Sequence, residues 1–83
     1  MWSEGIIARP KTGGKYKYWV KHFEEGSQFG IDGGRISKLV IRKVGESEDL
    51  VCYDRGWGKK PKGKESKAVC AIILSKFNDV EQM

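Results

Sequence analysis

The sequence has few of the residues on which catalytic and metal-binding signatures depend. It contains one histidine, His22, and two cysteines, Cys52 and Cys70, with no CxxC pair. This is typical of neither a disulfide-dense secreted scaffold nor a zinc module, so we expect two reduced thiols. The three residues would form a zinc site only if the fold brought them together. No nucleophile stands at a local spacing that would pair it with His22, so we expect neither an enzyme nor a metal or cofactor site.

Long apolar runs are also absent. No run approaches the roughly 20 residues that a membrane-spanning helix needs. The opening MWSEGIIARP lacks the basic-then-apolar layout of a signal peptide. We therefore expect a cytoplasmic protein with no membrane partner. The 83 residues, 39% of them hydrophobic, suit a single domain, residues 1–83, with a small core. The sequence predicts no particular oligomeric state.

Positive charge is present in excess. Sixteen Lys and Arg against eleven Asp and Glu give a formal net charge of +5. Such an excess in a small domain favours polyanionic partners, either nucleic acid or nucleotides. Small basic domains also bind acidic protein surfaces, so a protein partner is the alternative.

Glycine and proline divide the chain into short segments, several of which alternate apolar and polar residues with the period of a strand. The segments expected to be strands are Gly5 to Arg9, Lys15 to Phe23, Ile36 to Val44 and Asp49 to Asp54. The first is the weakest of them, an edge strand that Pro10 would end.

From Lys64 onward the period changes, because Val69, Ile72, Ile73 and Phe77 fall at helical spacing. This predicts an amphipathic helix of about twelve residues. Short links between the strands favour antiparallel pairing. The expected fold is therefore α+β, with a small antiparallel sheet of three to four strands and one C-terminal amphipathic helix packed on one face.

The helix would leave the other face of the sheet open to water. The side chains expected there surround Trp19 and Val40, and they are Lys15, Lys17, Lys21, Lys38 and Arg42. Cations around an aromatic ring can hold a phosphate backbone while the ring stacks on a base. The alternative is an ordinary solvated face, whose lysines discourage pairing between sheet edges. The segment KYKYWVKHF lacks the RNP1 pattern of an RRM domain.

The stretch GIDGGRISKL, from Gly30 to Leu39, is a second candidate site. Consecutive glycines expose backbone N–H groups, and Arg35 offers a planar fork, so the loop can cradle a phosphate. The alternative is a turn with a bulge, in which Asp32 caps a backbone N–H and the glycines are left-handed. The lysine of a P-loop is missing, and the following segment is expected to be a strand.

The stretch YDRGWGKK has similar chemistry. Trp57 lies between two glycines and is either a lid over the small core or a stacking surface. Arg55 either joins Arg35 at a shared ligand site or pairs with Asp32 or Asp54. The candidate ligand-binding residues of the two loops are Asp32, Gly33, Gly34, Arg35, Arg55, Trp57, Lys59 and Lys60.

Together, GIDGGRISKL, YDRGW and the lysines and proline before the helix resemble a family of small, uncharacterised proteins from phages, prophages and their bacterial hosts. The resemblance runs from Trp2 to about Phe77, with Asp32 where that pattern often has Asn. It implies a phage accessory role, and such proteins often bind and block host machinery. Two functions remain open. One is a non-enzymatic module that binds nucleic acid or a signalling nucleotide through the basic Gly-rich loops. The other is an anti-defence protein, of anti-CRISPR or another type, that docks on a host defence nuclease.

Overall fold

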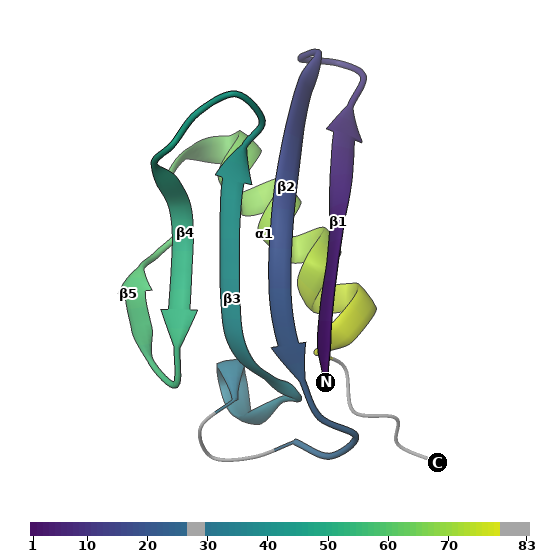
Figure 1. Cartoon of the computed structure of the whole chain (residues 1–83), viewed down its shortest axis with the longest axis vertical. Helices are drawn as coiled ribbons and strands as arrows, with labels where there is room; N and C mark the ends of the chain where they lie inside the picture. Colours follow the sequence, from purple (N-terminus) through teal and green to yellow (C-terminus); the bar gives the residue numbers. More distant parts are fainter. Residues whose placement is uncertain (27–29, 79–83) are drawn as a thin grey trace.

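Within the residues that the structure describes, five strands follow one another across an antiparallel sheet in the order of the sequence, and one α-helix covers one face (Figure 1). The computed structural model describes residues 1–26 and 30–78, apart from the side chain of Asp32. The strands are β1 (Trp2–Arg9), β2 (Gly14–His22), β3 (Ile36–Lys43), β4 (Asp49–Asp54) and β5 (Trp57–Lys59). A short 3-10 helix, η1 (Ile31–Gly33), precedes β3, and the helix α1 (Gly63–Phe77) follows β5.

The α+β class, the antiparallel pairing and the C-terminal helix agree with the prediction, but the number of strands was too low. The sheet has five strands, because the glycine-rich YDRGWGKK segment turns back and forms β5. In this turn the Asp54 N–H donates to the Gly56 carbonyl over 3.0 Å, and Tyr53 then pairs with Trp57. β1 begins at Trp2 instead of Gly5, and α1 has 15 residues.

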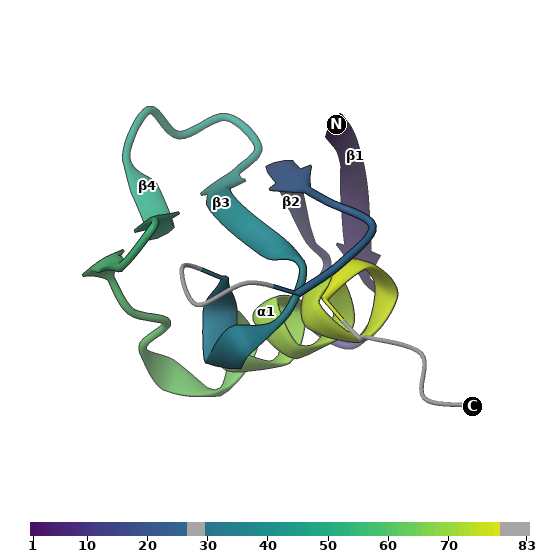
Figure 2. The ribbon, with the colours of Figure 1, turned by 90° about the horizontal axis from the view of Figure 1, so that it is seen from below.

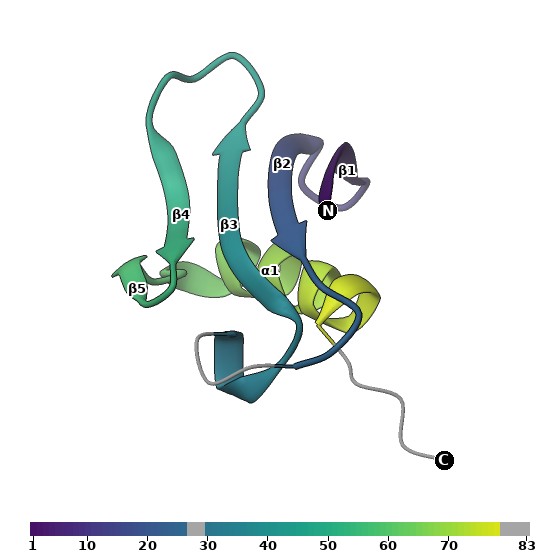
Figure 3. The ribbon, with the colours of Figure 1, turned by 60° about the horizontal axis from the view of Figure 1, so that its bottom comes forward.

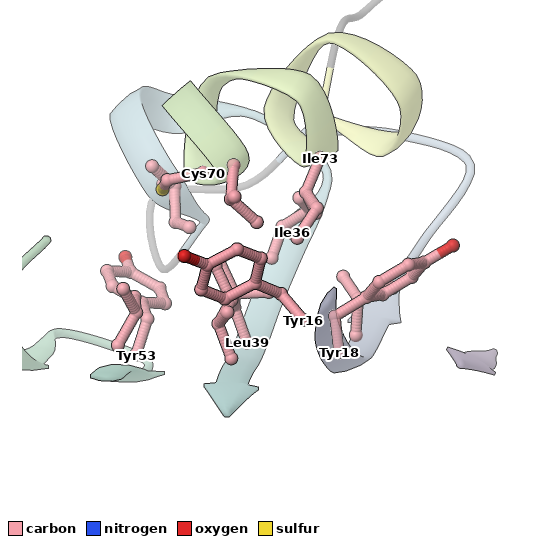
Figure 4. Close-up of a cluster of buried hydrophobic side chains, with 12 residues drawn as sticks. Tyr16, Tyr18, Ile36, Leu39, Tyr53, Cys70 and Ile73 are labelled. Atoms are coloured by element: carbon pink, nitrogen blue, oxygen red, sulfur yellow. The ribbon is translucent and has the colours of Figure 1, made fainter. Parts of the chain in front are cut away.

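The core lies between the sheet and α1 (Figure 4). The alternation predicted for β2 and β3 is confirmed, because Tyr16, Tyr18, Val20, Leu39 and Ile41 are all buried. Val51 and Tyr53 of β4 and Val69, Cys70 and Ile73 of α1 complete the layer. Each fully buried aliphatic side chain of this kind contributes about 1.5–3 kcal/mol to folding. Ile72, expected on the apolar side of the helix, is 39% exposed.

The two faces of the sheet therefore differ. Figure 2 shows α1 along one side of the sheet, and among the described residues no helix covers the opposite side. In the part of the chain that the structure describes, no helix is long and apolar enough to cross a membrane.

Candidate functional site

The loop GIDGGR is fastened to the C-terminal end of α1 through Asn78. The Asn78 Oδ1 accepts a hydrogen bond from the Ile36 N–H over 2.8 Å, and its Nδ2 donates to the Ile31 carbonyl over 2.9 Å. The Asn78 carbonyl accepts from the Arg35 N–H over 3.3 Å. A Cβ atom on Gly34 would lie 2.4 Å from the Asn78 side chain, so glycine is required there for close approach.

These contacts use the backbone N–H groups that a phosphate cradle would need. The N–H groups of Gly33 and Gly34 donate to the carbonyls of Gly30 and Ile31, over 3.1 and 2.8 Å. Together with the bonds to Asn78, every N–H from residue 33 to residue 36 is committed within the chain. An anion nest needs free N–H groups, so the backbone here favours the turn interpretation.

The turn differs in detail from the expectation. Gly33 is left-handed, with φ of +73°, as predicted, whereas Gly34 is extended, with φ of −88° and ψ of −161°. The expectation for Gly34 was wrong because close packing against Asn78, and not a positive φ, requires glycine there. The predicted cap by Asp32 lies outside the described residues, because the structure does not describe that side chain.

The second loop meets the first at the same end of the sheet. Figure 3 shows η1, the start of β3 and the turn between β4 and β5 gathered there. The Arg55 N–H donates to the Ser37 carbonyl over 2.9 Å, which places Arg55 beside the strand that Arg35 precedes. Arg55 has a φ of 59°, a strained value for a residue with a side chain. The Nε of Arg35 is buried without an acceptor in the described chain.

Trp57 and the lysines that follow it lie in different surroundings in the structure. The Trp57 ring packs edge-on against Tyr53, with ring centroids 5.0 Å apart, and it remains 37% exposed. Since Tyr53 is a core residue, this contact supports the lid interpretation. Lys59 pairs with Cys52, whose neighbour on β3 is Val40, so Lys59 belongs to the open face of the sheet. Lys60 follows it and is exposed.

The predicted open face is assembled by the register of β2 and β3. Across these strands Lys17 lies opposite Arg42, and Trp19 opposite Val40. The remaining pair is Lys21 with Lys38. Because side chains at alternate positions share a face, Lys15 belongs to the same surface, on the side away from α1.

Trp19 is the centre of this surface. The Nζ of Lys17 lies 5.0 Å from the ring centroid, and the guanidinium carbon of Arg42 lies 5.5 Å from it, both within cation–π range. Arg42 is itself held in place, because its Nε and Nη2 donate to Asp49 Oδ1 over 2.9 and 2.7 Å. The half-buried ring is therefore flanked by one flexible cation and one oriented cation.

Two shallow hollows share Trp19 and Arg42 as walls. The first, of about 450 Å³, also contacts Ile6 and Lys17, and the second, of about 350 Å³, also contacts Trp2 and Asp49. Trp2 and Ile6, which are 58% and 61% exposed, were not among the residues predicted for this surface. The strand alternation could have placed them there. Trp2 and Ile6 are each two residues from Glu4, so in β1 their side chains share the face of Glu4, which lies opposite Trp19.

The cations of the open face are unequally neutralised. Lys38 lies 3.7 Å from Asp54, and Arg42 pairs with Asp49. In residues 1–26 and 30–78, no ion pair to a carboxylate is formed by Lys15, Lys17 or Lys21. The net positive character of the surface therefore comes mainly from β2.

The histidine and the cysteines do not converge. His22 lies on the helix side, with its Nε2 2.9 Å from Ser3 Oγ and its ring 4.9 Å from that of Phe77. Cys70 is buried in the core, and burial raises the pKa of its thiol, whereas Cys52 lies on the open face. Among the residues described, no three His, Cys, Asp or Glu side chains form a group that could hold a metal ion.

The environment of His22 lowers its pKa. Burial is the largest cause, followed by the positive charges of the α-amino group and of Arg35. The neutral imidazole is therefore favoured in the folded chain.

Comparison with known proteins identifies a family and no activity. No curated protein and no solved structure matches the chain. The model of one family, described as a domain of unknown function (DUF7678), matches residues 1–78. Because this match covers nearly the whole length, the chain belongs to the DUF7678 family.

Proposed function

We propose that this protein is a non-enzymatic module that binds single-stranded nucleic acid on the open face of its sheet. The observation that carries the proposal is the arrangement around Trp19, a partly exposed ring between the Lys17 ammonium and the Arg42 guanidinium. An unpaired base can stack on this ring when the flexible Lys17 side chain moves off it, and the two cations then contact the phosphates on either side of the base.

The geometry of β2 favours a single strand over a duplex. Lys15, Lys17 and Lys21 recur along one side of the strand and span roughly 20 Å at the usual rise per residue. Stacking on Trp19 needs a base that has left its duplex partner, and sheet-based recognition of unpaired bases follows this pattern. A duplex would offer the face only its phosphates.

The Gly-rich loops have a smaller part in this proposal than the sequence suggested. Their N–H groups from residue 33 to residue 36 already have acceptors in the chain. Lys59, on the open-face side of β5, extends the positive surface toward the far edge of the sheet. The loops thus contribute side chains at the margin, and the centre of binding is Trp19.

Fluorescence anisotropy of a labelled oligonucleotide tests the proposal. The single strand is expected to bind at low salt, more tightly than the corresponding duplex or a free nucleotide, and to lose affinity linearly in log–log coordinates as salt rises. Absence of binding to all three ligands at low salt would contradict the proposal. Tighter binding of the free nucleotide would instead identify a small signalling ligand.

A second candidate function, docking on a host protein, is favoured by the turn between β4 and β5. This turn presents Arg55 in a left-handed conformation beside the partly exposed Trp57. Arginine and tryptophan are enriched among residues that dominate binding energy at protein interfaces, and backbone strain often marks such sites. The resemblance to phage and prophage proteins supports an anti-defence role for such docking.

Capture of one stoichiometric partner from host lysate tests this second function. Loss of the partner with Trp57→Ala would support the function, and capture unchanged by that substitution would exclude the turn as its site.

A further inference from the structure

The two edges of the sheet are protected to very different degrees. β5 forms one edge with only three residues, and Lys59, Lys60 and Pro61 stand at its end. Short length, lysine and proline are the usual devices that prevent an edge from pairing with another strand. β1 forms the other edge with eight residues, WSEGIIAR, which include neither lysine nor proline.

The backbone of β1 offers unpaired groups at its outer side. Met1 and His22 exchange two hydrogen bonds, of 2.9 and 3.1 Å, so they are a hydrogen-bonded pair of the antiparallel ladder. Such pairs recur at every second residue, which directs the N–H and C=O groups of Ser3, Gly5 and Ile7 toward β2. The groups of Trp2, Glu4, Ile6 and Ala8 therefore point outward, and in the described chain no strand lies beyond them.

We propose that a second copy of this chain pairs with β1, antiparallel and about a two-fold axis near Ile6. Alignment of the two strands at Ile6 places its exposed side chain against its copy and sets Glu4 opposite Ala8 of the other chain. Within each chain Lys15 lies beside Ala8. The small Ala8 side chain leaves Glu4 of one copy and Lys15 of the other about 10 Å apart at their backbones, within reach of each other.

This pairing follows from shape and charge together. The 61% exposed Ile6 becomes covered, and the outward backbone groups of Glu4, Ile6 and Ala8 gain partners. Glu4 of one copy also meets Lys15 of the other, which has no carboxylate partner in the described part of its own chain. The two-fold axis also keeps both open faces on one side of a continuous sheet. The backbones of the two Trp19 residues then lie roughly 20 Å apart, because they are separated by three strand spacings across the sheet and offset by four residues along it. The dimer itself does not depend on nucleic-acid binding.

Sedimentation equilibrium and residue-resolved amide exchange, from micromolar to millimolar chain concentration, test this proposal. The expected results are a monomer–dimer equilibrium and protection of the Glu4, Ile6 and Ala8 amides that grows with concentration. Ile6→Lys is expected to weaken dimerisation at least tenfold, whereas Trp57→Lys, at a 37% exposed residue of β5 on the opposite edge of the sheet, leaves it unchanged. A monomer at all concentrations, or a dimer dissociation constant that Ile6→Lys does not change, would overturn the proposal.

A charge exchange tests the alignment. Glu4→Lys alone is expected to weaken the dimer, and Glu4→Lys combined with Lys15→Glu is expected to restore it. Failure of the double substitution to recover any of the lost dimer, with the fold intact by circular dichroism, would exclude pairing aligned at Ile6.

Discussion

The guanidinium carbon of Arg42 lies 5.5 Å from the centroid of the Trp19 ring, while its Nη2 donates to Asp49 over 2.7 Å. The three residues come from β2, β3 and β4, so the sheet itself orients the cation beside the ring. A cation held in this way loses little further side-chain freedom when a phosphate arrives, which favours binding.

Removal of this cation should affect binding more than folding. Arg42→Ala is expected to lower the free energy of unfolding by only about 0.2–1 kcal/mol, because its ion pair with Asp49 is part-exposed. The same change should reduce the slope of log affinity against log salt by about 0.7, the loss of one contact to a single-stranded phosphate. Urea unfolding and anisotropy titrations measure the two quantities. An unchanged salt slope would remove Arg42 from the interface.

Asn78 is expected to be a main determinant of stability where the GIDGGR loop meets the end of α1. Asn78→Ala removes an acceptor for the Ile36 N–H and a donor to the Ile31 carbonyl, both part-buried. The expected loss in the free energy of unfolding is about 2–4 kcal/mol, since each orphaned group costs about 1–3 kcal/mol. Asn78→Asp, which keeps the acceptor, should cost less. A loss below about 0.5 kcal/mol for Asn78→Ala would contradict the role of this residue.

Gly34 and Asn78 should be coupled. A methyl group on Gly34 would overlap the Asn78 side chain, 2.4 Å away, although the extended backbone there suits alanine. Gly34→Ala is therefore expected to destabilise the wild-type chain by about 1–3 kcal/mol, as overpacking does. In the Asn78→Ala background the same change should cost much less. A double-mutant cycle of unfolding free energies measures the coupling, and strict additivity would exclude the steric explanation.

His22 should make stability depend on pH. Its folded pKa lies below the unfolded value of 6.5, so below that value the unfolded chain takes up a proton more readily than the folded one. The free energy of unfolding that the neutral His22 side chain contributes is therefore fully present above pH 6.5. It is lost as the pH falls through the folded pKa of His22. Because this is the single histidine, its ring proton resonances report the folded pKa directly in an NMR titration. A folded pKa at or above 6.5 would contradict this assignment, and His22→Gln should remove the effect.

The strand alternation predicted the arrangement of β2 and β3 well, because residues such as Tyr18 and Trp19 differ clearly in what they can bury. β5 was not predictable in this way. It depends on the turn at Arg55, which has a positive φ. Such a φ can be expected from the sequence at glycine, asparagine or aspartate, but not at arginine. The clamp by Asn78 was equally hidden, since it joins the end of α1 to a loop more than 40 residues earlier. Of the two glycines that suggested a phosphate cradle, Gly34 serves this packing and Gly33 supplies the positive φ of the turn.

Comparison of Trp19→Ala with Trp57→Ala in oligonucleotide titrations tests the central claim most directly. Trp19 lies on the open face, whereas Trp57 packs on Tyr53 at the opposite edge from β1. Comparison of the two variants therefore distinguishes the loss of base stacking on Trp19 from the effect of removing any tryptophan side chain. Trp19→Ala is predicted to weaken binding of a single strand by about 5- to 150-fold, the value of one stacked base, with Trp57→Ala close to wild type. Equal affinities for Trp19→Ala and the wild-type chain, with both folded, would contradict nucleic-acid recognition on this face.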